Sequence, residues 1–207
     1  MSYDQYGEAR DAMYDEISRE LYPDHKAQAI SEFTTSRLQS YYISNPMVMR
    51  PAVDSIQEGK RLQANEHSAA AVVFFVTAIE LLLKATLLKP VVHGLVHSEG
   101  LAKIIVEQAL GQSGFDRYAK LLERLFTELA NLDINTVTRD KAQRSLLKEC
   151  TELQQLRNGI IHQGGSAAPE QAESARLVSV AVYDLVVIPM LDTLGLKVVA
   201  RGEIKQR

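Results

Sequence analysis

The sequence predicts an all-helical fold, and three observations lead to this prediction. No stretch alternates polar and apolar residues with a period of two over a useful length. The proline and glycine residues fall between segments rather than inside hairpins. Several segments instead repeat apolar residues every three or four positions, as one buried face of a helix does.

Composition places the chain among soluble globular proteins. Its 207 residues are 46% hydrophobic and 24% charged, with a formal net charge of −3. These values exclude a disordered chain and a collagen-like repeat. The single cysteine, Cys150, cannot form an internal disulfide and is typical of a reducing compartment. The balanced charge argues against sequence-blind coating of nucleic acid but leaves room for a local basic stripe.

The first residues carry no targeting signal, because residues 1–10 are polar and acidic. The most apolar run, residues 69–83, is interrupted at Glu80 and is shorter than the roughly 20 residues of a membrane span. We therefore expect a cytoplasmic protein with no membrane contact, in which this run is a buried core helix.

An N-terminal helical extension is expected over residues 1–50. Tyr6, Met13, Ile17 and Leu21 share one face of a helix over about 4–21, which should end before Pro23. A second helix, over about 25–42, has a weaker apolar face. Their polarity indicates that both helices are peripheral.

A helical bundle is expected over residues 51–195. The N-terminal half of this range predicts a long apolar helix that Pro90 ends and a further helix that Ser98 caps. The second part predicts a long helix stopped by Gly164 and a last helix kinked at Pro189. The predicted ranges are 52–64, 68–89, 98–110, 115–130, 138–163 and 169–194. The tail, residues 196–207, is polar and is expected to fray.

Residue patterns for metal and cofactor chemistry are weak, so we expect neither. His93 and His97 are the one histidine pair with ligand-like spacing, and Gly94 with Pro90 favours a loop there. Glycine-rich phosphate-binding motifs are missing. Cys150 falls on an apolar stripe, where an inert thiol is expected.

Arg157 occupies an unusual position on the predicted helix 138–163. At 100° per residue it falls in the core-facing row with Leu153 and Ile160. A buried guanidinium needs an acceptor. Glu80, the charge inside the most apolar helix, could supply it, or Glu80 could instead pair with Lys84 four residues on. The sequence does not favour either of these two pairings of Glu80 over the other.

Cations recur on the opposite face of the same predicted helix. Lys141, Arg144 and Lys148 follow at steps of three and four and lead toward His162. Such a row could bind successive phosphates of RNA, with His162 transferring a proton at one of them. The alternative is the ordinary solvated face of an amphipathic helix.

Two motifs resemble the HEPN superfamily. The run from Arg157 through Asn158 to His162 is similar to the family's R-N-x3-H signature. Residues 78–84, AIELLLK, are similar to the A-[IL]-E-x3-K pattern on the family's second core helix. The resemblance covers residues 51–194 and leaves the first fifty unexplained.

The resemblance implies a dimeric helical bundle that cleaves RNA without a metal, as toxins and effectors of prokaryotic defence do (phage resistance, abortive infection, toxin–antitoxin systems). His162 would transfer the proton, Arg157 would stabilise the phosphorane and Asn158 would orient a phosphate oxygen or the histidine ring. Glu80 would hold Arg157 in place. Implied partners are RNA, a second copy of the chain, and an antitoxin or regulatory protein.

Dimerisation is also expected on geometric grounds. Arg157 and His162 point about 140° apart on an ideal helix, so two chains related by a twofold axis would bring them together more readily than one. The expected interface comprises the helices that carry residues 69–84 and 157–162. The alternative function is a non-catalytic HEPN-fold binding or scaffolding module. A helical transcriptional regulator is disfavoured, because no convincing helix-turn-helix is visible.

Overall fold

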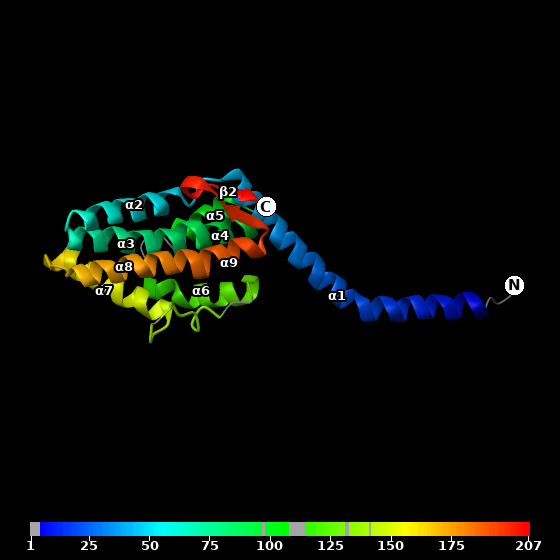
Figure 1. The fold of residues 1–207 in the computed structure, drawn as a ribbon. Coiled ribbons are helices and arrows are strands. Elements are labelled where there is room, and N and C mark those ends of the chain that lie inside the picture. The colour runs from blue at the N-terminus through cyan, green and yellow to red at the C-terminus, as the bar shows by residue number, and fades with distance from the viewer. Residues whose placement is uncertain (1–4, 97, 108–114, 131–132, 141) are drawn as a thin grey trace. The chain divides into compact units, whose positions relative to one another are not determined.

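The computed structural model of the protein describes residues 5–96, 98–107, 115–130, 133–140 and 142–207. These residues form helices and one short hairpin, which confirms the all-helical prediction in its coarse form (Figure 1). The chain divides into two compact units, Met1–Arg37 and Leu38–Arg207.

The N-terminal region is one long helix rather than two. Helix α1 (Gln5–Ser44) continues through Pro23, where a break was predicted. A proline inside a helix removes one backbone donor, and the remaining hydrogen bonds of this 40-residue helix are sufficient to keep it continuous. The division between the units also lies earlier than residue 50, because Leu38, Tyr42 and Met49 are fully buried in the core of the second unit.

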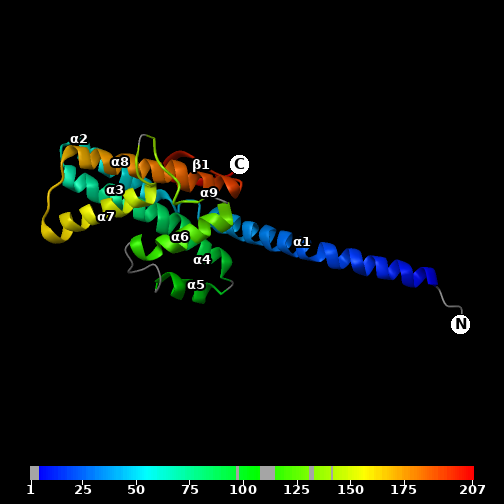
Figure 2. The same ribbon diagram turned by 90° about the horizontal axis from the view of Figure 1, so that it is seen from below.

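The core of the second unit is built around α3 (Ser68–Leu83), as the apolar run predicts. Helices α2 (Arg50–Ala64), α3 and α8 (Pro169–Val182) lie side by side, and α7 (Leu146–Gln163) also packs on α3 (Figures 1 and 2). Eight of the 16 residues of α3 are buried within the single chain. This burial removes one argument for a dimer through α3, namely that one bundle could not cover so apolar a helix.

Both apolar helices continue past the proline that was expected to end or kink them. A π-helical turn, η1 (Lys84–Leu88), precedes Pro90 and leads into α4 (Lys89–Leu95), whereas the prediction ended this helix at Lys89. A second such turn, η3 (Tyr183–Val187), precedes Pro189 and leads into α9 (Ile188–Thr193). Widened turns of this kind accommodate the missing donor and the bulk of the proline ring.

The hydroxyl of Tyr42 compensates for the amide that Pro90 lacks. In a regular helix residue 90 would donate its N–H to the carbonyl of Thr86, four residues earlier. Tyr42 donates its hydroxyl to that carbonyl at 2.6 Å, and both residues are fully buried. Burial raises the pKa of Tyr42, which keeps the hydroxyl protonated as a donor. The end of α1 is thereby fastened to the core.

Helices α5 and α6 complete the helical part. Helix α5 (Glu99–Ile105) begins after Ser98, whose hydroxyl accepts the Leu101 amide at 3.4 Å as the predicted cap. The predicted end of this helix, residues 108–110, lies outside the described residues. Helix α6 (Phe115–Ala130) has the predicted bounds.

Within the described residues, two helical stretches are long and apolar enough to cross a membrane, namely 68–95 and 169–193. About 61% and 50% of their most apolar windows are buried inside the fold. Such burial is also typical of core helices in a soluble bundle.

The C-terminal tail is ordered, contrary to the expectation that it frays. Strands β1 (Leu196–Val198) and β2 (Ile204–Gln206) form an antiparallel hairpin around the 3-10 turn η4 (Ala200–Gly202). Leu196 and Ile204 are buried, and the Ile204 amide donates to the Pro46 carbonyl at 2.8 Å. These two buried side chains and the backbone bond attach the tail to the rest of the unit.

Candidate active site

The helix that carries the R-N-x3-H motif begins later than predicted. Helix α7 starts at Leu146 rather than at 138, with Ser145 extended at its N-cap and the Leu146 amide bonded to the Val137 carbonyl at 2.8 Å. Arg144 therefore precedes the helix, and Lys141 lies outside the described residues. The prediction of a row of three cations along one helix face is wrong, because Lys148 alone of the three lies on α7.

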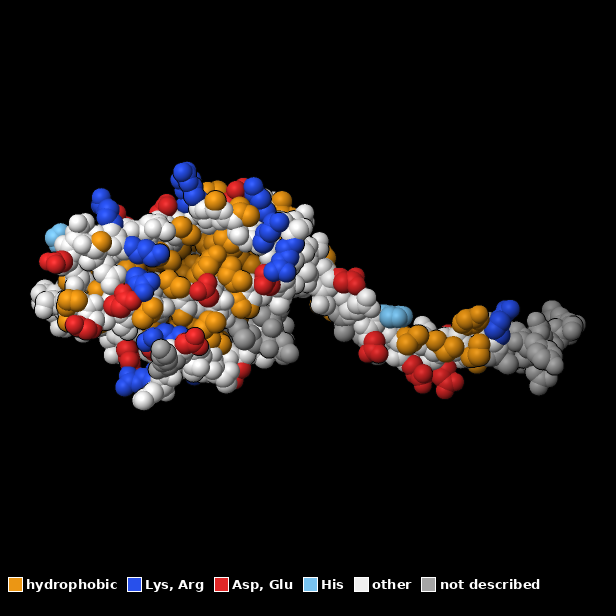
Figure 3. All heavy atoms as spheres, in the orientation of Figure 1, with side chains coloured by type: hydrophobic (Ala, Val, Ile, Leu, Met, Phe, Trp, Pro, Cys, Tyr) orange, Lys and Arg blue, Asp and Glu red, His pale blue; other side chains and the backbone are white. Residues whose placement is uncertain are grey.

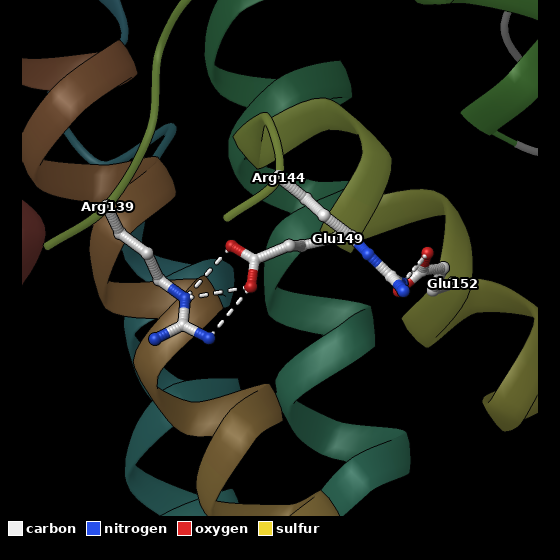
Figure 4. Close-up of polar contacts among 4 residues, drawn as sticks. All are labelled: Arg139, Arg144, Glu149 and Glu152. Carbon is white, nitrogen blue, oxygen red and sulfur yellow. Dashed lines mark hydrogen bonds and ion pairs between the residues drawn. The ribbon is translucent and has the colours of Figure 1, made fainter. Parts of the chain in front are cut away.

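Acidic residues of α7 bind two arginines of the preceding segment (Figure 4). Arg139 donates to both carboxylate oxygens of Glu149, from Nε at 3.0 and 2.9 Å and from Nη2 at 2.8 Å. Arg144, expected to bind RNA, forms an ion pair with Glu152 instead. Lys148 is exposed and forms no ion pair within the described part of the chain.

The sequence pattern did not predict these two ion pairs. Arg139 and Glu149 are ten residues apart, and Arg144 and Glu152 are eight apart. On one continuous helix neither separation is the three or four residues that bring side chains together. Because α7 starts only at Leu146, the segment before it can place both arginines beside the helix. The sequence does not mark this start clearly, since Ser145 makes no side-chain cap hydrogen bond.

The C-terminal end of α7 is as predicted and sets the position of His162. Gly164 adopts a left-handed conformation, with φ of 67°, and closes the helix. The amide of Gly165 bonds to the Gly159 carbonyl at 3.2 Å. This glycine cap is a common helix stop. It leaves His162 exposed in the last turn of the helix.

Arg157 lies on the core-facing row of α7, as predicted, but its guanidinium is incompletely bonded. The side chain is half-buried beside the buried row that contains Cys150 and Leu153. Nη1 donates to Oδ1 of Asn158 at 3.2 Å, whereas the buried Nε has no hydrogen-bond partner. Among the residues that the structure describes, no carboxylate forms an ion pair with Arg157. An unpartnered buried donor is costly and rare.

No hydrogen bond or ion pair joins Glu80 to Arg157 within the described residues, so the expected pair is not formed. The charge of Glu80 acts on Lys84 instead: burial lowers the pKa of Lys84, and Glu80 opposes this by raising it. Of the two pairings that the sequence left even, the one between Glu80 and Arg157 is not formed within the described residues, and the charge of Glu80 favours the protonated form of Lys84.

The remaining motif residues form a short exposed group. Asn158 and His162 are one turn apart on the same face of α7, and both are exposed. The bond from Arg157 ties the guanidinium to Asn158 and leaves the Asn158 amide nitrogen to donate elsewhere. Arg157 is thus bonded to Asn158, His162 lies one turn beyond Asn158, and neither Glu80 nor Arg144 is paired with these residues within the described structure.

A hollow of about 980 Å³ lies beside the loop that follows His162. It is lined by residues of the α2–α3 turn, including Glu66 and His67, and by Ser166, Ala167 and Pro169. The three motif residues are not part of its lining. The described residues contain no group of three metal-ligating side chains, and His93 instead stacks on Tyr41, while His97 is outside the described residues.

No family model, curated protein or solved structure matches this chain.

Proposed function

We propose that this protein is a metal-independent endoribonuclease of the HEPN type, active as a homodimer. The observation that supports the proposal most is the guanidinium of Arg157. It is half-buried, its Nε has no acceptor, and no described carboxylate neutralises it. Because Nε is buried, a phosphate oxygen would bind through the Nη atoms of this guanidinium, a group that pairs well with phosphate. Asn158 and His162 lie within two turns of the same helix end.

The reaction proposed is attack of an RNA 2′-hydroxyl on the adjacent phosphorus. His162 of one protomer removes the 2′-proton as the 2′-oxygen–phosphorus bond forms. The bond from phosphorus to the 5′-oxygen then breaks, and a protonated His162 of the second protomer gives the leaving oxygen its proton. Arg157 stabilises the negative charge on the phosphorane, and the Asn158 amide donates to one of its oxygens.

A dimer is part of this proposal because one chain supplies one histidine, whereas the reaction needs a base and an acid. Arg157 and His162 also diverge by about 140° around the helix. A twofold axis near the ends of the two α7 helices would set His162 of one chain beside Arg157 of the other.

The biological setting proposed is prokaryotic defence, in which the enzyme acts as a toxin or effector in the cytoplasm. An antitoxin or regulatory protein would then restrain it. This part of the proposal rests on the resemblance of the R-N-x3-H motif alone.

A second candidate, a non-catalytic HEPN-fold module, is favoured by one specific observation. Arg144 is paired with Glu152, and the expected row of cations along α7 is not formed. A binding or scaffolding module would not need a row of cations that binds the phosphates of RNA.

An RNA cleavage assay with purified full-length protein separates these candidates. The enzyme should cleave RNA in the presence of EDTA, and His162→Ala should abolish cleavage, since proton transfer by a placed side chain is worth about 10²–10⁴ in rate. Arg157→Ala should abolish it as well. Lys148→Ala is the matched control on the same helix and should weaken RNA binding only. Absence of cleavage by the wild-type protein would favour the non-catalytic module, whereas full activity of His162→Ala or cleavage that EDTA stops would contradict the proposed mechanism.

A further inference from the structure

An apolar groove of about 300 Å³ lies on the second unit, between α2, the end of α8 with η3, and the C-terminal hairpin. Figure 3 shows hydrophobic side chains gathered on this face, with charged side chains of both signs around them. The apolar lining consists of Val53, Ile56, Val180, Tyr183, Val198 and Val199. A largely apolar hollow of this size that contains a few polar groups is typical of a site for a small ligand.

Helices α2 and α8 run antiparallel along the groove. Gln63 of α2 donates to the carboxylate of Glu173 of α8 at 2.9 Å. Val53, ten residues earlier on α2, lines the groove together with Tyr183, which follows Glu173 by ten residues. The residues of the two elements can therefore be placed level with one another along the groove.

The lining carries one charge of each sign, toward opposite ends of the groove. Lys60 lies seven residues beyond Val53 on α2, and Asp184 directly follows Tyr183. At a helical rise of 1.5 Å per residue, the Cα atoms of Lys60 and Asp184 are about 12 Å apart along the groove. Both side chains are exposed, and neither forms an ion pair with a described residue. Both charges are therefore open to a ligand.

The other charged residues of α2 and the hairpin are paired or lie outside the lining. Three neighbouring acids have basic partners of their own, in the pairs Arg50–Asp54, Arg61–Glu58 and Lys205–Glu203. Lys197 is exposed and directly precedes Val198 on β1. Neighbouring residues of a strand point to opposite faces, so Lys197 faces away from the side on which Val198 lines the groove. Arg201 is exposed in η4 and is not part of the lining.

Two uncharged polar side chains also line the groove. Neither the amide of Gln57 nor the hydroxyl of Tyr183 forms a hydrogen bond with a described residue. Burial and the charge of Asp184 raise the pKa of Tyr183, so its hydroxyl stays protonated and can donate. A hydrocarbon chain would leave both groups without partners, whereas the amides of a peptide would supply them.

We propose that the groove binds a short apolar peptide with free ends, whose carboxylate pairs with Lys60 and whose ammonium pairs with Asp184. An extended chain spans about 3.3–3.6 Å per residue, so three residues cover about 10 Å, close to the separation of the two charges. The apolar side chains of the peptide pack on the valines of the lining. The site uses no residue of α7, so it is compatible with the dimer contact proposed at the end of that helix.

Isothermal titration calorimetry of full-length protein with the tripeptide Val-Ala-Val, free at both ends, tests the proposal. Saturable binding at one site is expected below about 1 mM. Lys60→Gln should weaken binding about tenfold, and so should amidation of the peptide carboxylate. In the Lys60→Gln protein amidation should have no further effect, because the carboxylate has already lost its partner. Asp184→Asn and acetylation of the peptide ammonium should behave in the same way at the other end.

Lys197→Gln is the matched control. It removes an exposed lysine next to the lining and should leave the affinity unchanged, with the same melting curve as wild type for all three variants. Absence of saturable binding below about 1 mM, or an effect of amidation that persists in Lys60→Gln, would overturn the proposal. Tighter binding of octanoate than of the tripeptide would also overturn it and would indicate a fatty-acid ligand. Cleavage of RNA is measured separately, so failure of this site and failure of the proposed activity are distinguishable.

Discussion

Removing the Tyr42 hydroxyl tests how the core tolerates Pro90. Tyr42→Phe leaves the ring in place but takes the hydroxyl from the Thr86 carbonyl, to which Pro90 offers no amide. Leaving a buried acceptor unpaired costs about 1–3 kcal/mol. At a central value of about 2 kcal/mol, a domain of this size should lose roughly 4–8 °C in melting temperature.

The assay is a double-mutant cycle followed by thermal and urea unfolding. In a Pro90→Ala background residue 90 regains an amide that can reach the Thr86 carbonyl, so Tyr42→Phe should cost at least about 1 kcal/mol less there. Tyr41→Phe is the matched control, since no described hydrogen bond uses its hydroxyl while its ring stacks on His93. Equal costs of Tyr42→Phe in both backgrounds, or a cost no larger than that of Tyr41→Phe, would refute the reasoning.

Three further outcomes follow from packing and charge. Burial raises the pKa of Cys150, so this thiol should resist alkylation in native protein and react fully in urea; rapid native labelling would contradict its placement. Hydrogen bonding from Arg176 lowers the pKa of Glu173 to about 2, so its stabilising effect should be complete above pH 4.5 and be lost as pH falls through about 2. Arg176→Gln should return this pKa toward 4.5 in an NMR titration. Gly59→Val should destabilise by about 1–3 kcal/mol in urea unfolding, because even a Cβ there would lie 2.7 Å from the Phe75 ring.

The features predicted correctly from the sequence are those that local patterns determine. The apolar run of α3 is stable only when it is buried in the core. Gly164 and Ser98 are residue types that commonly end and cap a helix, and they do so here. The row of Cys150 and Leu153 follows directly from helical periodicity.

The errors arise where the rest of a helix or a tertiary contact overrides a local signal. Pro23 and Pro90 were expected to end helices, but the helices continue, at Pro90 through a widened turn and with the Tyr42 hydroxyl on the Thr86 carbonyl. No pattern in the sequence near Pro90 could reveal a donor 48 residues earlier.

The positions of the candidate residues along α7 could be predicted from the sequence, but the partners of their side chains could not. Arg157, Asn158 and His162 lie at one helix end, as their spacing indicates. The acceptor expected for Arg157, Glu80, depended on tertiary geometry, and no ion pair joins the two residues within the described part of the chain. The cation row depended on a helix start at 138, whereas α7 starts at Leu146 and Arg139 bonds to Glu149 from the segment before the helix.

The most direct test of the central claim, that Arg157, Asn158 and His162 cleave RNA through its own 2′-hydroxyl, is the chemistry of the product ends. Purified protein in EDTA should convert a short RNA into fragments with 2′,3′-cyclic phosphate and 5′-hydroxyl ends, identified by mass spectrometry. An RNA with a 2′-deoxy residue at the cleavage site should remain intact, and so should RNA treated with His162→Ala. Cleavage of the deoxy-substituted RNA, or fragments with 5′-phosphate ends, would contradict the account.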